Sequence, residues 1–376
     1  MSVTLTAKPG TEVRRIISEQ QQTGSVFIEH AGWQTPAHFG DAATEYRSAR
    51  RNASLFDLSA RGKIELAGPD ALKFLHNLCT QEVKNLPVGT GCEAFLTNAK
   101  ARVIAPILVG HFHHLDQDRL LLDGEPGLAT KILQHLNRHL ISEQVELADR
   151  TREFALVHLC GPNAQIILEK VGGGPLPDLP MLHHVTRSVG NVLCHVRRHQ
   201  PLALPGYDLF CDSLNGAEVW RTLIAGGASP AGSEVYEILR VEAGTPVFGQ
   251  DIDEDRFAVE VGRSEQAICF TKGCFLGQEP IVMARDRGHV NRLLVGIKIS
   301  KGGSVANGTR LFRDDSEVGQ VTSSVFSPQL QQTIALAYVR RGSWEPGTVL
   351  QMEPLSEGRQ GVVAKLPLAD PVLDAK

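Results

Sequence analysis

The sequence predicts an α+β fold made of two similar subdomains followed by a small β-barrel or sandwich. The first reason is a repeat: L-A-G-P-D-A-L-K-F-L (66–75) and L-C-G-P-N-A-Q-I-I-L (159–168) share leucine, glycine, proline, Asp or Asn, and alanine at identical spacing. Both segments are typical of a strand, a glycine turn and a helix with proline at its first position. The second reason is that six short strands with turn residues between them follow Asn291, as in a small barrel or sandwich.

The spacing of apolar residues predicts further elements around the repeats. A helix is expected to begin at Asp41, with Tyr46 and Ala49 on one stripe and arginines on the other. Residues 91–109 are expected to form a hairpin, because two apolar strands flank the polar N-A-K. Other helices are predicted after Pro126 and over the segments V-W-R-T-L-I and S-E-V-Y-E-I-L-R-V-E.

The bulk properties exclude several classes of protein. At 376 residues the chain exceeds one ordinary core, and its length predicts two or three domains. The net charge of -4 gives no general attraction to nucleic acid, so no direct nucleic-acid partner is expected. No run of about 18 apolar residues occurs and the N-terminus lacks the apolar core of a signal peptide, so we expect a cytoplasmic protein with no membrane partner.

The cysteine pattern argues against a disulfide framework. Seven cysteines occur, an odd number, and no C-x-x-C pair is present. Neither a set of disulfides nor a preformed structural zinc site is therefore expected. Three of the cysteines lie in apolar stretches, where a free cysteine usually acts as a small buried hydrophobe: Cys160, Cys194 and Cys211.

Cys274 differs from these three, because it lies in the glycine-rich stretch T-K-G-C-F-L-G-Q-E-P (271–280). Lys272 offers a positive charge two residues away, and a helix beginning near Gly277 would add partial positive charge; both favour the reactive thiolate. On these residues alone a glycine turn with a packed cysteine is favoured, because lone cysteines are usually structural. One cysteine cannot hold an iron–sulfur cluster, which needs about four protein ligands.

Other chemical motifs are weak or missing. H-F-H-H (111–114) invites a metal interpretation, but no spacing such as H-E-x-x-H accompanies it, and a polar loop between strands is the favoured interpretation. No metal site is predicted. Walker, G-x-G-x-x-G and G-x-S-x-G motifs do not occur, so nucleotide hydrolysis, dinucleotide redox chemistry and serine-hydrolase chemistry have no support.

Six segments carry a resemblance to a known family. They are H-A-G-W-Q-T-P-A-H-F-G-D, R-R-N-A-S-L-F-D-L-S, G-P-D-A-L-K-F-L-H-N-L-C-T-Q-E-V, L-R-V-E-A-G-T-P-V-F-G-Q-D, K-G-C-F-L-G-Q-E and V-G-Q-V-T-S-S-V-F-S-P. In this order they resemble the folate-binding proteins related to the glycine-cleavage T-protein (aminomethyltransferase), over about residues 25–365. The form K-G-C-[aromatic]-x-G-Q-E resembles the YgfZ branch, which includes a mitochondrial iron–sulfur assembly factor.

The resemblance implies a fold and a function. Two interlaced α+β subdomains (residues 11–288) and a C-terminal β-barrel (residues 289–370) are expected to form a ring around a central cavity that holds tetrahydrofolate. The motif cysteine of the branch supports assembly or repair of iron–sulfur enzymes, among them tRNA-modifying ones. Iron–sulfur proteins are therefore the expected clients.

The resemblance also implies site residues. Cys274 corresponds to the motif cysteine, and Lys272 accompanies it, so these two are the expected catalytic residues. Arg240, in L-R-V-E-A-G, is expected either to contact an anionic end of folate or to form a structural ion pair with Glu242 or a neighbouring carboxylate. The expected folate-binding residues are Arg240, Gln278, Glu279 and Asp208.

Two departures weaken the expectation of aminomethyl transfer. In the transferases the hairpin strand carries a pair of aspartates, whereas this chain has Ala105 and Pro106, which cannot move a proton. The transferase segment G-Y-T-G-E-D-G-F-E is represented only by its end, P-G-Y-D-L-F, which keeps Asp208, and Leu204 falls where the pterin-contacting glutamate would lie.

Three functions stay open at this point. The first is a non-transferase, folate-binding accessory factor for iron–sulfur enzymes that uses Cys274. The second is a tetrahydrofolate-dependent aminomethyltransferase with substituted acid–base residues. The third is a folate-binding scaffold whose cysteine only packs. Retention of Cys274 without the acid–base pair favours the first over the second but does not separate the first from the third.

Overall fold

The computed structural model describes residues 19–21, 25–114, 117–288, 290–300, 303 and 305–370. The chain forms two compact units that alternate along the sequence. Unit 1 takes residues 1–63, 149–200 and 205–235, and unit 2 takes residues 64–148, 201–204 and 236–376. The predicted interlacing is thus present in the chain order, although residues 11–18, where the first predicted domain begins, lie outside the described residues.

Unit 1 is built on a six-stranded sheet with the strand order β10-β11-β12-β9-β3-β13. All neighbours are antiparallel except β13, which runs parallel to β3. A separate hairpin, β1 and β2, precedes it. The strands are β1 (Val26–His30), β2 (Trp33–His38), β3 (Ser54–Asp57), β9 (Phe154–Cys160), β10 (His184–Val189), β11 (Val192–Arg198), β12 (Gly206–Asp212) and β13 (Ser229–Pro230).

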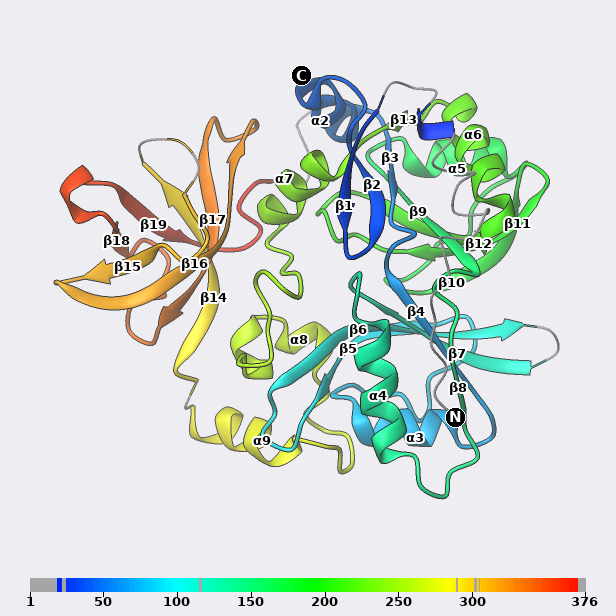
Figure 1. Ribbon diagram of the computed structural model, residues 1–376, viewed down its shortest axis with the longest axis horizontal. Helices are drawn as coiled ribbons and strands as arrows, with labels where there is room; N and C mark the ends of the chain where they lie inside the picture. The colour runs from blue at the N-terminus through cyan, green and yellow to red at the C-terminus, as the bar shows by residue number, and fades with distance from the viewer. Residues whose placement is uncertain are drawn as a thin grey trace. The chain divides into compact units, whose positions relative to one another are not determined.

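Helices cover one face of this sheet (Figure 1). They are α5 (Ala164–Val171) and α6 (Gly216–Gly226), the latter preceded by the short η1 (Ser213–Asn215). The predicted helix at Asp41 is confirmed as α2 (Ala42–Arg51), and the Asp41 side chain accepts from the N–H groups of Ala43 and Thr44. Burial of Trp220 and its apolar neighbours on α5 and α6 gives unit 1 its core.

Strand alternation leaves a second, polar face on the same sheet. On β9, Val157 and Leu159 pack in the core under α5 and α6, so His158 between them points to the opposite face. The same reasoning places Arg197 of β11 and Asp208 of β12 on that face. All three side chains are nevertheless buried.

Unit 2 contains a five-stranded sheet with the order β5-β6-β7-β4-β8. Its two helices, α3 (Ala71–Leu78) and α4 (Ala129–His139), share one apolar core with the strands and lie on one face (Figure 1). The predicted 91–109 hairpin is confirmed as β5 paired with β6. The strands are β4 (Gly62–Ala67), β5 (Gly91–Thr97), β6 (Val103–His114), β7 (Gln117–Gly124) and β8 (Glu146–Asp149).

The repeat is the same structural device in both units. Gly68 follows β4 with φ +117°, and Gly161 follows β9 with φ +125°, a region that favours glycine. A Cβ at Gly68 would lie 2.3 Å from the Gln144 carbonyl oxygen, and one at Gly161 would lie 2.5 Å from the Asn52 carbonyl oxygen. The prediction of proline at the first helical position was wrong, because α3 and α5 begin two residues after their prolines, with Asp70 and Asn163 as N-caps.

The six predicted C-terminal strands form a closed barrel with the order β14-β17-β16-β15-β18-β19 (Figure 1). They are β14 (Arg292–Ile299), β15 (Arg310–Arg313), β16 (Ser316–Ser327), β17 (Gln332–Arg340), β18 (Val349–Met352) and β19 (Gln360–Ala364), with η3 (Leu355–Glu357) before the last. Closure pairs both edges of the sheet and leaves no open strand. Among the described residues, no helix is long and apolar enough to cross a membrane.

Within the described residues, four helices lie between β13 and the barrel in sequence. They are α7 (Ser233–Ala243), η2 (Ala258–Val261), α8 (Ser264–Ala267) and α9 (Gln278–Arg287). Two of them position residues that the sequence singles out. Arg240 lies on α7, and Cys274 lies just before α9.

Candidate functional site

The loop that carries Cys274 is fixed by backbone hydrogen bonds at both ends. The Cys269 N–H donates to the Thr80 carbonyl and the Leu276 N–H donates to the Asn77 carbonyl, both at 2.9 Å. The Thr97 hydroxyl also donates to the Leu276 carbonyl at 2.7 Å. The loop therefore has a defined course beside the end of α3.

Lys272 fixes the middle of the loop from inside. Its buried ammonium group donates three hydrogen bonds to the carbonyl oxygens of His76 (2.6 Å), Cys79 (2.8 Å) and Gln81 (2.7 Å). These carbonyls lie at and just after the C-terminus of α3, where a cation is favoured. Burial lowers the pKa of Lys272 below its usual value. The structure thus places the predicted catalytic Lys272 as the group that positions the loop.

The helix expected after the loop is confirmed as α9, which begins at Gln278. Gly277 precedes it with φ +84°, and a Cβ there would lie 2.6 Å from the Asn98 carbonyl oxygen. Only glycine fits this position without strain. The turn from the Cys274 loop into α9 therefore depends on this residue.

Cys274 is exposed, whereas the other six cysteines are buried or half-buried. The three cysteines predicted to be buried hydrophobes, Cys160, Cys194 and Cys211, are buried, which confirms that prediction. Cys269 is half-buried at the other end of the loop. Burial raises its pKa, but hydrogen bonds with Thr271 and from the Lys272 N–H outweigh burial and lower it below the usual value.

A histidine that the sequence did not reveal lies beside this loop. The Nε2 atom of His76 is 4.0 Å from the position of a Cβ on Gly273, the residue before Cys274. Its Nδ1 atom is 3.2 Å from a carboxylate oxygen of Glu82. Burial and the neighbouring Lys272 charge lower the pKa of His76. His76 thus contributes two groups to this region: its carbonyl accepts from Lys272, and its ring lies beside Gly273.

The remaining motif residues lie at the start of α9. The Gln278 side chain donates to the Lys272 carbonyl at 3.5 Å, a long contact. Glu279 is exposed and lines a pocket of about 520 Å³ together with Arg102, Glu260 and Met283. Their expected role in folate binding stays a prediction.

Arg240 is fully engaged inside unit 2. Its side chain is 1% exposed and makes five hydrogen bonds, as many as a guanidinium group has N–H donors. Two go to Glu237, and one each to Asp251 (2.8 Å), the Ser323 hydroxyl (2.8 Å) and the Thr245 carbonyl (3.1 Å). The geometry favours the structural alternative for Arg240, and its carboxylate partners are the neighbouring Glu237 and Asp251.

Asp208 organises the polar face of unit 1. One carboxylate oxygen accepts from His158 Nδ1 at 2.7 Å, and the other accepts from His199 Nδ1 at 2.8 Å and from Arg197 at 2.6 Å. Burial opposes its ionisation, but His199 and Arg197 hold the pKa of Asp208 well below its usual range. Burial lowers the pKa of His199.

His158, His199 and Asp208 are close enough to be considered as metal ligands. Both histidine contacts are hydrogen bonds from Nδ1 to a carboxylate, which fix Nδ1 as the donor in each ring. Arg197 already compensates the carboxylate charge at 2.6 Å. The cluster is thus a charge-balanced network without an added cation. In the neutral ring that donates from Nδ1, Nε2 of His158 is an acceptor, and this buried atom has no hydrogen-bond partner among the described residues.

Strand β6 carries none of the expected acid–base groups. Ala105 is buried in the core of unit 2, and Pro106 pairs with Phe95 on β5. The whole strand, V-I-A-P-I-L-V-G-H-F-H-H, contains no carboxylate. The structure also places residues 111–114 at the end of this strand, so the expectation that H-F-H-H forms a loop was wrong.

The α+β units and the six-stranded barrel define the fold of aminomethyltransferases. The GCVT N-terminal domain model matches residues 16–266, and the glycine cleavage T-protein C-terminal barrel domain model matches residues 292–370. The chain belongs to the glycine cleavage T-protein family, whose members typically bind tetrahydrofolate.

Two similar relatives are named aminomethyltransferases. The chain is 29% identical over 324 residues to an aminomethyltransferase of Rubrobacter xylanophilus, covering 86% of each chain. It is 29% identical over 353 residues to one of Halothermothrix orenii, covering 92% of this chain and 97% of the relative. The fold matches the crystal structure of the glycine cleavage system aminomethyltransferase T from Bartonella henselae with a TM-score of 0.85 at 21% identity, over 95% and 98% of the two chains.

Proposed function

We propose that this protein binds tetrahydrofolate and supports assembly or repair of iron–sulfur enzymes, including tRNA-modifying ones, through Cys274, as in the YgfZ branch. The observation that carries the proposal is the loop: Cys274 is exposed, while Lys272 beside it is buried and bonded to three carbonyls. A loop held from both ends and from inside presents its thiol in one place.

These contacts indicate different roles for Lys272 and Cys274 in the loop. Lys272 acts as a positioning residue, because its ammonium is directed at the end of α3. Cys274 is the group left accessible for a client protein or a transferred sulfur. His76 borders the loop, with its Nε2 atom 4.0 Å from the position of a Cβ on Gly273.

The polar face of unit 1 offers one hydrogen-bond acceptor that a pterin could use. Leu204, which replaces the expected glutamate, is buried and apolar, so it offers no acceptor. The unpartnered Nε2 atom of His158 does offer one, and a pterin ring presents amino and ring N–H donors. Asp208 contributes by orienting His158 and His199, since both of its oxygens are already occupied. When bound, tetrahydrofolate would supply a one-carbon carrier.

A second candidate function is tetrahydrofolate-dependent aminomethyl transfer. The names of the relatives favour it, because they are aminomethyltransferases at 29% identity over most of the chain. The absence of a carboxylate from β6 argues against it, since Ala105 and Pro106 cannot take part in proton transfer. We therefore rank it second.

Complementation tests the first proposal. In a bacterial strain that lacks its own factor of this kind, we expect the wild-type chain to restore the activity of iron–sulfur enzymes and Cys274→Ala to fail. The alanine variant should fold normally, because substitution of an exposed residue changes stability by no more than about 0.5 kcal/mol. The readout is the activity of an iron–sulfur tRNA-modifying enzyme, measured as the modified nucleoside.

The matched control is Cys269→Ala, which removes the other accessible thiol of the same loop. It should restore activity as well as the wild type does. Equal rescue by Cys274→Ala would show that the cysteine only packs. If Cys269→Ala failed and Cys274→Ala rescued normally, the functional thiol would be Cys269 and the proposal would be wrong.

A further inference from the structure

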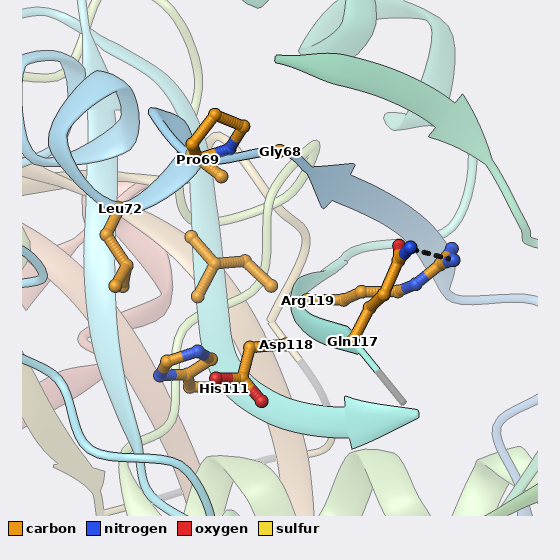
Figure 2. A pocket seen from close by; sticks show the side chains of 9 residues that line it. Gly68, Pro69, Leu72, His111, Gln117, Asp118 and Arg119 are labelled. Carbon is orange, nitrogen blue, oxygen red and sulfur yellow. Dashed lines mark hydrogen bonds between the residues drawn. The ribbon is translucent and has the colours of Figure 1, made fainter. Parts of the chain in front are cut away.

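Unit 2 contains a second pocket, of about 460 Å³, which neither the cysteine loop nor the polar face of unit 1 shares. One wall is the turn into α3, formed by Gly68, Pro69, Ala71 and Leu72. The other wall is the β6–β7 hairpin, with the residues His111, Gln117, Asp118, Arg119 and Leu120. Figure 2 shows these side chains around the opening.

One side of the pocket offers hydrogen-bond acceptors. His111 Nδ1 lies 2.7 Å from the Leu86 carbonyl, and because a carbonyl can only accept, Nδ1 must carry the proton. The Nε2 atom of the neutral ring is therefore an acceptor. His111 is 6% exposed, and none of the described residues donates to this nitrogen. The carboxylate of Asp118, half exposed and bonded to His113 at 2.8 Å, adds negative charge to the same wall.

The opposite side offers hydrogen-bond donors. The N–H groups of Leu72 and Lys73, in the first turn of α3, have no acceptor within the described parts of the chain. The N-cap residue, Asp70, does not satisfy them, because its carboxylate accepts from the Gln144 N–H at 2.8 Å. First-turn N–H groups point along the axis towards Gly68 and Pro69, at the pocket wall, and they favour an anion.

The charges of the hairpin wall are balanced by nearby partners. Arg119 donates to Glu65 at 2.6 Å and to the Gln117 side chain at 3.4 Å, a contact visible in Figure 2. The Glu65 carboxylate therefore largely compensates the positive charge of Arg119. A simple anion would meet the Asp118 carboxylate and the lone pair of His111, and a simple cation would leave the donors of α3 unused.

We propose that this pocket binds a small zwitterion of the amino-acid type. Its ammonium group donates to His111 Nε2 and Asp118, and its carboxylate accepts from the N–H groups at the start of α3. A volume of about 460 Å³ is enough for a molecule of a few carbon atoms. This site rests on no part of the proposed folate or iron–sulfur function.

Ligand-observed NMR with the full-length protein tests the site. The probes are glycine, β-alanine and γ-aminobutyrate, which separate the two charges by increasing lengths, with butyrate and butylamine as analogues that each lack one charge. We expect saturable binding of at least one amino acid, and affinity at least about tenfold lower for both analogues than for the amino acid that binds best. Binding of either analogue as tight as that of this amino acid would overturn the proposal.

The variant for this test is Asp118→Asn, which keeps the shape of a half-exposed side chain. It should weaken binding of the zwitterion by about tenfold or more. Asp314→Asn removes the same charge from an exposed barrel turn and should leave affinity unchanged. Unchanged affinity in Asp118→Asn, or no binding of any of the three amino acids, would mean that the pocket holds only water.

Discussion

Replacing Arg240 by methionine is expected to lower the free energy of unfolding by about 3–5 kcal/mol, the usual cost of removing one partner of a buried ion pair. The reason is the state of Asp251, whose side chain is 0% exposed. Without Arg240, the partners of the Asp251 charge among the described residues would be the Val247 N–H and the hydroxyls of Thr322 and Ser323. Urea denaturation of the wild type and the variant at neutral pH measures the difference.

Two further variants identify the cause of this loss. Arg240→Lys keeps the charge but replaces five donors with three, so an intermediate loss is expected. Adding Asp251→Leu to Arg240→Met should recover part of the stability, because the unpaired carboxylate is removed. A loss below about 1 kcal/mol for Arg240→Met would contradict the structural role and return Arg240 to the candidates for folate binding.

Lys272→Met is expected to lower the free energy of unfolding by about 2–4 kcal/mol. Methionine fills a similar volume, but it leaves the three carbonyls of His76, Cys79 and Gln81 without their donor. The loop before α9 should then move more freely, so the rate at which iodoacetamide alkylates Cys274 should change as well. Denaturation curves and peptide-level mass spectrometry measure the two effects.

The matched control is Lys100→Met, which removes an exposed lysine from the β5–β6 turn. Its stability should stay within about 0.5 kcal/mol of the wild type. If Lys272→Met were as stable as Lys100→Met, the ammonium would not hold the loop. The positioning role would then have to be withdrawn.

Much of the fold was predictable because its signals are local. The helix capped by Asp41, the 91–109 hairpin and the six strands of the barrel each follow from patterns within about a dozen residues. The repeated glycine turn was visible for the same reason, since both Gly68 and Gly161 adopt a positive φ that follows from their local role. The residue at which α3 and α5 begin depended on capping detail and was missed.

The site was harder to predict because its partners are distant in sequence. The Lys272 ammonium bonds to the His76 carbonyl, 196 residues away, and Arg240 reaches Ser323, 83 residues away. Spacing could identify the motif around Cys274 but not what its lysine contacts. The sequence left open a structural ion pair of Arg240 with Glu242 or a neighbouring carboxylate, and the structure shows pairs with the neighbouring Glu237 and Asp251.

The polar cluster of unit 1 could have been predicted from the pattern of polar residues in the sequence. Arg197 lies near the end of β11 and His199 follows that strand, while His158 and Asp208 lie between apolar residues on β9 and β12. Polar residues at interior strand positions must find partners, so together they predict a buried network. Of this cluster only Asp208 was predicted from the sequence, and its partners His158, Arg197 and His199 were missed.

We propose that this chain, which has the T-protein fold, binds tetrahydrofolate without transferring aminomethyl groups. The most direct measurement supplies the purified protein with tetrahydrofolate and an aminomethyl donor and follows ammonia and methylene-tetrahydrofolate, with an active aminomethyltransferase as the positive control. We predict saturable folate binding with no ammonia above the rate without enzyme. Sustained release of ammonia together with methylene-tetrahydrofolate would contradict the claim and establish the transferase.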